Sequence, residues 1–205
     1  MLTSKLETDR IIAIGSSTGG NEALQHILTQ LPIATSSILI VQHMPADFTE
    51  SFAKRLDRVC DIDVKEANDK ETINPGVAYI APGDKHMQLK KTGDTYRIKL
   101  SEDPIDTLHK PAIDILFESI TETLGCYSLG IILSGMGEDG AKGLQRMKDV
   151  GALTIAQDES SSAVYSMPKA AINSGAVCKC LSLDQIAQEI VHFTSELKAN
   201  LEREY

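Results

Sequence analysis

The chain has 205 residues, of which 42% are hydrophobic and 24% are charged, and its formal net charge is −9. This length and apolar content predict one domain with a full core, and no apolar run approaches the ~18 residues that a membrane-spanning helix needs. The negative charge repels phosphate backbones and anionic lipids, so the composition argues against nucleic acid as a partner and against membrane insertion.

Apolar runs alternate with helix-like stretches along the chain. Strands are predicted at Ile11–Ile14, Ile38–Val41, Ile62–Val64, Val77–Ala81, Leu129–Leu133 and Leu153–Ala156, with Ala176–Cys178 as a candidate seventh. Helices are predicted near Asn21–Leu31, Thr49–Val59, Ile113–Thr123, Ala141–Val150, Pro168–Ser174 and Leu183–Leu201. An antiparallel hairpin is predicted from Met87–Lys90 and Tyr96–Leu100, which alternate around a turn at Gly93. The pattern predicts an α/β fold with a doubly wound, mostly parallel sheet of about seven strands and helices on both faces.

The turn Gly15-Ser16-Ser17-Thr18-Gly19-Gly20 directly follows the first predicted strand and precedes a helix. Its frame Gly-x-Ser-x-Gly is that of a nucleophile elbow, in which the central hydroxyl projects at the end of a strand, and this favours Ser17 as a nucleophile. The alternative is a non-catalytic anion- or nucleotide-binding module that uses the same glycine-rich turn at a helix N-terminus. A Walker-type loop would end in Gly-Lys-Ser/Thr, and this turn continues with Asn21 and Glu22.

A serine nucleophile needs a base, and the base is usually a histidine that is oriented by a carboxylate. His43 follows the second predicted strand, and the carboxyl ends of parallel strands meet at one edge of a sheet, so His43 is the preferred base. His86 and His109, both in predicted loops, are weaker alternatives, and His43 is also consistent with a plain strand-end position.

The carboxylate is expected after the strand Leu129–Leu133, in a turn that holds Glu138 and Asp139. Asp139 is preferred because of its short side chain and its place before a predicted helix, where it also fits the role of a helix N-cap. The glycines on either side of Met136 allow its backbone N–H to approach an oxyanion. Met136 and Thr18 are therefore assigned to substrate or oxyanion binding.

The cysteines and the first ten residues bear on the cellular compartment. Cys178 and Cys180 are the only close pair, and their spacing fits neither a Cys-x-x-Cys redox motif nor a complete zinc site. Residues 1–10 mix acidic and basic side chains, unlike a secretory signal. We therefore expect a cytoplasmic monomer with reduced cysteines and with neither a cofactor nor a bound metal.

Several runs occur in the same order as in one known family. The chain resembles the chemotaxis protein-glutamate methylesterases, the CheB family, over roughly residues 10–190. The resemblance rests on the runs Ile12–Gly20, Gln42–Pro45, Ala81–Met87, Leu133–Gly140 and Met167–Pro168. It implies a catalytic triad of Ser17, His43 and Asp139. It also implies hydrolysis of glutamate γ-methyl esters on methyl-accepting chemotaxis receptors, with release of methanol, and deamidation of receptor glutamines.

The resemblance also implies a division of the chain. Residues 10–195 would form the catalytic domain, residues 1–9 an N-terminal tail, and residues 196–205 the end of the last helix and a tail. Family members usually carry an N-terminal phosphorylatable receiver domain, and only Met1–Asp9 precede the first predicted strand here, so the expectation is a catalytic domain without a receiver. Leu108 and Ala112 stand where a basic residue and a serine are usual in the family.

Overall fold

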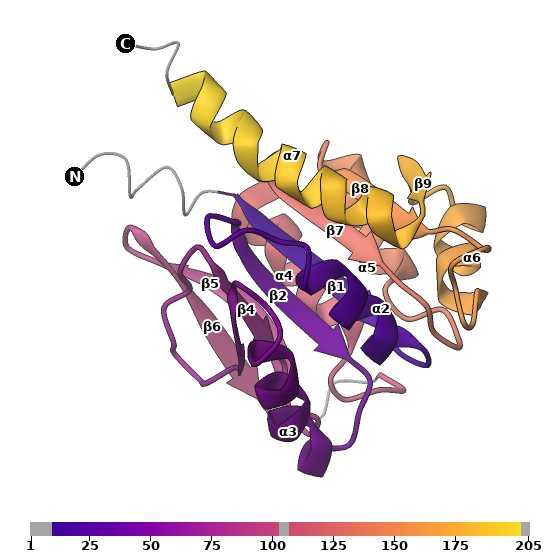
Figure 1. Cartoon of the computed structure of the whole chain (residues 1–205), viewed down its shortest axis with the longest axis horizontal. Coiled ribbons are helices and arrows are strands. Elements are labelled where there is room, and N and C mark those ends of the chain that lie inside the picture. Colours follow the sequence, from indigo (N-terminus) through magenta and orange to yellow (C-terminus); the bar gives the residue numbers. More distant parts are fainter. Residues whose placement is uncertain (1–9, 103–106, 202–205) are drawn as a thin grey trace.

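The computed structural model describes residues 10–102 and 107–201. Its main sheet has seven strands, which pair in parallel throughout and are shown as arrows in Figure 1. In sheet order these are β3 (Asp63–Glu66), β4 (Val77–Ile80), β2 (Ser37–Gln42), β1 (Ile11–Ser16), β7 (Ser128–Ile132), β8 (Leu153–Gln157) and β9 (Lys179–Leu181). The chain builds one half of the sheet outward from β1 and then returns to build the other half from β7. The loops after β1 and β7 therefore diverge to leave a crevice at the carboxyl edge of the sheet.

Helices cover both faces of this sheet, as a doubly wound fold requires. One face packs against α2 (Gly20–Leu28), α3 (Ala46–Asp57) and α7 (Leu183–Leu201). The other packs against α4 (Ile113–Leu124), α5 (Ala141–Asp149), α6 (Ser166–Asn173) and the antiparallel hairpin of β5 (His86–Thr92) and β6 (Thr95–Ser101). A short 3-10 helix, η1 (Gly125–Tyr127), precedes β7. The predicted fold class is confirmed.

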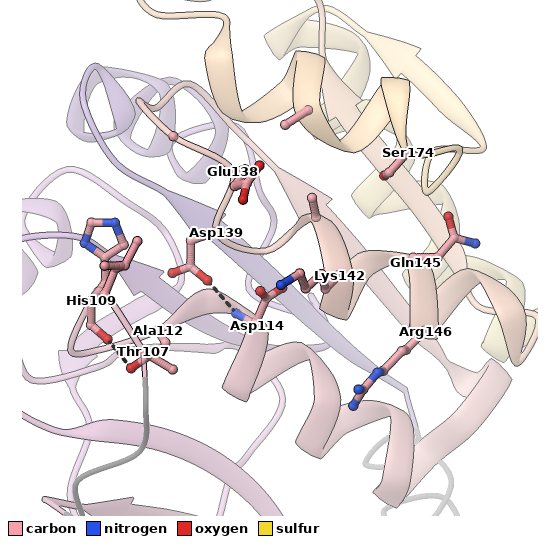
Figure 2. Close-up of a pocket in the computed structure, with 14 residues that line it drawn as sticks. Thr107, His109, Ala112, Asp114, Glu138, Asp139, Lys142, Gln145, Arg146 and Ser174 are labelled. Atoms are coloured by element: carbon pink, nitrogen blue, oxygen red, sulfur yellow. Dashed lines mark hydrogen bonds between the residues drawn. The ribbon is translucent and has the colours of Figure 1, made fainter.

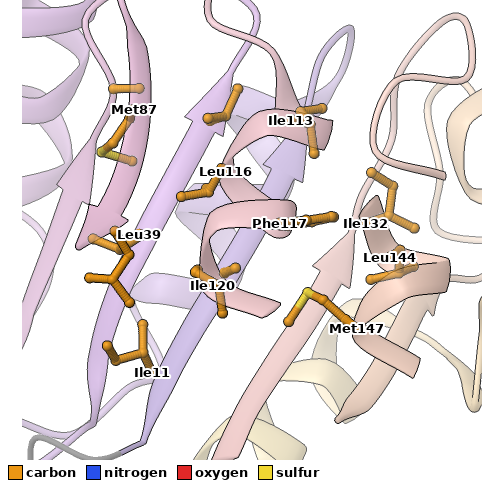
Figure 3. Close-up of a cluster of buried hydrophobic side chains, with 14 of the residues drawn as sticks. Ile11, Leu39, Met87, Ile113, Leu116, Phe117, Ile120, Ile132, Leu144 and Met147 are labelled. Carbon is orange, nitrogen blue, oxygen red and sulfur yellow. The ribbon is translucent and has the colours of Figure 1, made fainter. Parts of the chain in front are cut away.

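The apolar runs of the sequence become strands that are buried on both faces. In β1, Ile11 and Ala13 contribute to one core layer, and Ile12 and Ile14 to the other. Figure 3 shows the first layer, where side chains of α4 such as Phe117 lie over the sheet. Burying one such side chain stabilises the fold by about 1.5–3 kcal/mol, so these layers hold the strand ends, and the loops they carry, in fixed positions.

Differences from the predicted elements are concentrated near the C-terminal half. The last strand is β9, not Ala176–Cys178, because Ala176 accepts a hydrogen bond from the Thr154 hydroxyl (2.7 Å) in the turn after α6, and ladder pairing with β8 starts only at Lys179. Pro168 lies inside α6, which begins at Ser166, because proline is tolerated in the first turn of a helix.

The predicted tail at residues 1–9 lies outside the described residues, as do residues 202–205. Residues 196–201 continue α7. Within the described ranges, no helix has the length and hydropathy of a membrane span.

Candidate active site

The turn after β1 is fixed against the end of β7. The Ser17 N–H donates to the Ser134 carbonyl (3.0 Å), and the Gly20 N–H donates to the Ser17 carbonyl (2.9 Å). Gly19 has a φ of 79°, which favours glycine, and a Cβ there would lie 2.5 Å from the Ala163 Cβ. The turn is therefore packed on both sides, and it leaves Ser17 partly exposed at the carboxyl edge of the sheet.

Gln42, the last residue of β2, ties this turn to the loop that carries His43. Its side-chain amide donates to the carbonyls of Ser17 (2.9 Å) and His43 (3.1 Å) and accepts from the buried Ser16 hydroxyl (2.6 Å). Gly20 makes room for this amide, since a Cβ would lie 2.2 Å from it. Sequence reasoning did not single out Gln42, although its position between a buried strand and a candidate base was a usable signal.

His43 forms a hydrogen bond with Asp139 at the entrance to the sheet crevice. The distance from His43 Nε2 to Asp139 Oδ2 is 2.9 Å, and the two side chains are only 10% and 11% exposed. Asp139 also accepts the N–H groups of Ile113 (2.8 Å) and Asp114 (3.1 Å), the first residues of α4. Burial alone would raise the pKa of Asp139, but the hydrogen bonds from His43 and from the two N–H groups outweigh it, and the pKa is lowered. Asp139 is therefore a stable anion beside the imidazole.

Asp139 and Asp114 cap each other's helices. Asp139 precedes α5 but caps α4, while Asp114 in the first turn of α4 accepts the Gly143 N–H of α5 (2.7 Å). The expectation that Asp139 caps the helix beginning near Ala141 is wrong: the N-cap there is Gly140, and it makes no side-chain cap. Burial raises the pKa of Asp114, although the Gly143 N–H lowers it in part. These reciprocal hydrogen bonds fix the N-termini of α4 and α5 relative to each other, and they thereby hold Asp139 in place.

The other ring nitrogen of His43 has no hydrogen-bond partner among the described residues. His43 Nδ1 is buried, and no hydrogen bond reaches it within the described parts of the chain. Because Nε2 lies against the Asp139 carboxylate, Nε2 carries the proton in the neutral ring and Nδ1 holds the lone pair. His43 and Ser17 line the same hollow of about 410 Å³, together with Thr18, Gly19, Asn21, Gln42, Met44, Pro45 and Phe48.

No hydrogen bond joins the Ser17 hydroxyl to His43 in the described residues. Catalytic hydrogen bonds are often long in a protein without substrate and tighten when substrate binds. The shared hollow and the free Nδ1 lone pair allow the ring to take a proton from a hydroxyl placed there. The arrangement can thus support nucleophilic chemistry at Ser17.

The two alternative histidines lie close by in different roles. The His109 ring stacks on the His43 ring, with centroids 4.2 Å apart and planes inclined by 26°. His86 is fully buried, and its Nδ1 accepts the Ala112 N–H at 3.3 Å. Burial lowers the pKa of His86, and the positive charge of Lys110 lowers it further. Neither ring has a hydrogen bond to Asp139 within the described ranges.

A second, larger cleft of about 700 Å³ opens on the other side of Asp139. Figure 2 shows its wall, with His109 and Asp139 at one end and Lys142 and Arg146 of α5 further along. Glu138 also lines this cleft and lies apart from the His43 hydrogen bond. The two partners of the His43–Asp139 hydrogen bond therefore line different hollows: His43 lines the small hollow with Ser17, and Asp139 lines the broad, mixed-charge cleft.

The two residues assigned to oxyanion binding lie on loops that face solvent. Thr18 is exposed, and the Met136 side chain is 67% exposed. Gly135 and Gly137 donate their N–H groups to acceptors across the loop, whereas the described structure gives no protein acceptor for the N–H groups of Thr18 and Met136. Both groups are available as donors, and their assignment stays a prediction.

The geometry of the glycine-rich turn differs from that of an anion-binding loop. Two of its N–H groups, those of Ser17 and Gly20, already donate to protein carbonyls. Asn21 stands where a phosphate loop would present lysine. In the two described ranges, no group of three or more His, Cys, Asp or Glu side chains is arranged to hold a metal ion.

A doubly wound α/β sheet with a serine turn and a buried His–Asp pair at its carboxyl edge is the arrangement typical of serine-type α/β hydrolases. Residues 12–190 match the family model described as CheB methylesterase, and the chain belongs to that family. The predicted family is thereby confirmed.

Curated relatives and a solved structure agree with this membership. The chain is 49% identical over 189 residues to protein-glutamate methylesterase/protein-glutamine glutaminase 3 of Shewanella oneidensis, covering 92% of this chain and 53% of that protein. It is 48% identical over 186 residues to protein-glutamate methylesterase/protein-glutamine glutaminase of Escherichia coli K12, covering 91% and 53%. The crystal structure of the Thermotoga maritima CheB methylesterase catalytic domain superposes with a TM-score of 0.87 at 38% identity, covering 89% of this chain and 97% of that one. The chain spans about half the length of the curated relatives it matches.

Proposed function

We propose that this chain is a serine esterase that hydrolyses glutamate γ-methyl esters of chemotaxis receptors and releases methanol. The same site would deamidate receptor glutamines and release ammonia. The family membership and the names of the relatives support this proposal. The observation that carries it is the buried His43–Asp139 hydrogen bond, which leaves Nδ1 without a partner in the hollow that Ser17 lines.

In the first half of the reaction, the Ser17 oxygen attacks the ester carbonyl carbon and its proton passes to His43 Nδ1. The tetrahedral oxyanion accepts hydrogen bonds from the backbone N–H groups of Thr18 and Met136. The intermediate then collapses: the bond to the methoxy oxygen breaks, His43 Nδ1 returns the proton to that oxygen, and methanol leaves. Ser17 remains as a glutamyl ester of the substrate.

In the second half, water attacks this acyl-enzyme while His43 Nδ1 takes the proton of the water. Collapse of the second intermediate breaks the bond to Ser17, which recovers its proton from His43, and the glutamate carboxylate is freed. Asp139 keeps the ring in the Nε2–H tautomer and stabilises the imidazolium that forms in both steps. Its lowered pKa keeps the carboxyl ionised near neutral pH.

We assign the catalytic domain to residues 10–195, with flanking segments at 1–9 and 196–205, and this range contains the matched residues 12–190. We infer that the domain acts as a monomer in the cytoplasm on membrane-bound receptors. Support for the monomer is that Ser17, His43 and Asp139 all come from one chain and lie at one sheet edge.

The test is methanol release from methylated receptor membranes by the chain as it stands, with ammonia release from receptor glutamines measured in parallel. We expect release of both products that depends on enzyme concentration. The absence of methanol from a folded preparation would refute the proposed esterase.

A further inference from the structure

The hairpin of β5 and β6 presents a row of cations on its outer face. Its inner face packs the apolar side chains Met87, Leu89, Tyr96 and Ile98 into the core. Because side chains alternate along a strand, the outer face carries Lys90 and Lys99 together with Arg97. Lys70, on the segment that lies along β6, completes this group, which we call the cationic face.

The cationic face surrounds a hollow of about 300 Å³, lined by Asp69, Lys70, Lys90, Thr92, Arg97, Ile98, Lys99 and Leu100. Two carboxylates lie near it at the edge of ion-pairing range: Asp69 is 3.9 Å from Lys70, and Glu122 is 3.9 Å from Lys90. Lys99 and Arg97 have no carboxylate within ion-pairing distance in the described residues. Four positive charges therefore face two negative ones, on a chain whose net charge is −9.

Two features of the cationic face cost stability. Lys90 and Arg97 lie directly opposite each other in the antiparallel register, where like charges repel. Lys70 has a φ of 62°, in the left-handed region that a lysine seldom adopts, and its side chain is 88% exposed. The Lys70 carbonyl accepts from the Arg97 guanidinium (2.9 Å), which fixes the two residues together. A bound anion would relieve the repulsion.

The hairpin is also anchored to the candidate active site. Its first residue, His86, accepts the Ala112 N–H, and the next two N–H groups of the chain donate to Asp139. Lys90 is four residues along β5 from His86, which is about 13 Å at the rise of a strand. In Figure 1 the β6 arrow points to the same edge of the molecule as the β2 arrow. A single protein segment can therefore contact both the cationic face and the site.

We propose that the cationic face holds an acidic, glutamate-bearing segment of the protein substrate while another glutamyl group of the same substrate enters the site of Ser17. This proposal rests on the proposed function, because the relatives' names identify the substrate as a protein that carries glutamates. We expect contacts at the cationic face to stabilise the bound substrate and the transition state equally. They lower KM and leave kcat unchanged.

The test compares the wild type with Lys90→Gln/Lys99→Gln, which removes two charges and keeps the Arg97 and Lys70 hydrogen bonds. The control is Lys54→Gln/Arg58→Gln, which removes one exposed charge from α3 and one from the residue directly after it. Methanol release is measured against the concentration of methylated receptor at low and at high salt, after melting curves show that neither variant is less stable than the wild type. We expect KM of the hairpin variant to rise about five-fold at low salt, with kcat unchanged, and the difference to shrink at high salt. Lys90→Glu/Lys99→Glu should raise KM further.

Any of three results would overturn the proposal. The KM of Lys90→Gln/Lys99→Gln could equal that of the wild type, the KM of the control could rise equally, or the variant could lose only kcat. Two further measurements show whether the cationic face binds something other than the substrate protein. Receptor-free anionic vesicles that bind the wild type but not the variant would assign the face to a membrane, and a dimer lost only in the variant would assign it to a second copy. If the wild type releases no methanol, the proposed function fails. Receptor binding by the Ser17→Ala forms of both proteins then still tests the cationic face.

Discussion

The two nitrogens of the His43 ring differ in their hydrogen bonds: in the described chain Nε2 has a partner and Nδ1 has none. The Nε2 side meets Asp139, whose carboxylate accepts three hydrogen bonds and sits between two helices that cap each other. The Nδ1 side opens on the hollow that contains Ser17, and its buried nitrogen has no partner in the described chain. An unsatisfied buried polar atom is costly, and a catalytic role is one reason why a fold keeps such an atom.

The contrast teaches which contacts the fold provides in advance. Asp139 orients the His43 ring, and backbone N–H groups at the N-terminus of α4 hold Asp139 in place. The core fixes the position of that helix. The hydrogen bond between His43 Nδ1 and the Ser17 hydroxyl is not formed in advance. We expect it to form when substrate binds. Substitutions on the two sides of the ring should therefore differ in their effects, from a large loss of turnover to almost none.

Ser17→Ala should lower turnover by about 10⁵-fold, because the proposed nucleophile is removed from the open side while no core volume is lost. Initial rates of methanol release from methylated receptor measure this. Ser16→Ala is the matched control: it removes a buried hydroxyl that donates to Gln42 and should cost about 1 kcal/mol of stability with a far smaller loss of rate. Equal losses of rate in the two variants would contradict the assignment of Ser17.

Asp139→Asn should lower turnover by about 10³- to 10⁴-fold, because an amide N–H facing Nε2 forces the wrong tautomer on His43. It should also lower the melting temperature, because the anion at the α4 N-terminus is lost. The lowered pKa of Asp139 means that its stabilisation is present above the pKa of the unfolded chain, about 3.9, and disappears as pH falls through the folded value.

The difference in melting temperature between wild type and Asp139→Asn should therefore be largest near neutral pH and should shrink below about pH 4. Normal turnover in a destabilised but folded variant would make Asp139 a cap alone. Glu138→Gln serves as the control, since Glu138 lies outside the His43 hydrogen bond.

Asp114→Asn should leave the free energy of unfolding unchanged or raise it by less than about 1 kcal/mol at pH 7, because Asn keeps an acceptor for the Gly143 N–H and removes a buried charge. The pKa of Asp114 is raised, so the folded state favours the protonated acid. The advantage of the variant should disappear as pH falls through that raised pKa. Denaturant melts at several pH values decide this, and a strong destabilisation at pH 7 would mean that the Asp114 charge itself holds the helices.

Thr18→Ala and Met136→Ala should each change kcat by less than about three-fold, because the proposed oxyanion donors are backbone N–H groups that both variants keep. Steady-state kinetics with methylated receptor measure this. A loss of a hundred-fold in either would show that the side chain itself contacts the reacting atoms.

The sheet and its order of elements were predictable because long, doubly buried strands leave continuous apolar runs in the sequence. The approach of Ser17, His43 and Asp139 to one edge followed from their positions after parallel strands. The exchange of caps between Asp139 and Asp114 could not be predicted, because it depends on how α4 and α5 meet in space. The stack of His109 on His43 was missed for a similar reason, because it depends on how two loops meet in space. Gln42 was missed although its position between a buried strand and the candidate base was a usable signal.

The most direct test of the division between the two sides of His43 is a nitrogen-15 NMR measurement of the neutral ring, with the His43→Gln variant used to assign the signals. We expect Nε2 to carry the proton and to donate it in the hydrogen bond to Asp139, and Nδ1 to be unprotonated. In Asp139→Asn this preference should be lost. A ring protonated on Nδ1 in the wild type would place the lone pair on Nε2, next to the Asp139 carboxylate, and would contradict the proposed roles of the two nitrogens.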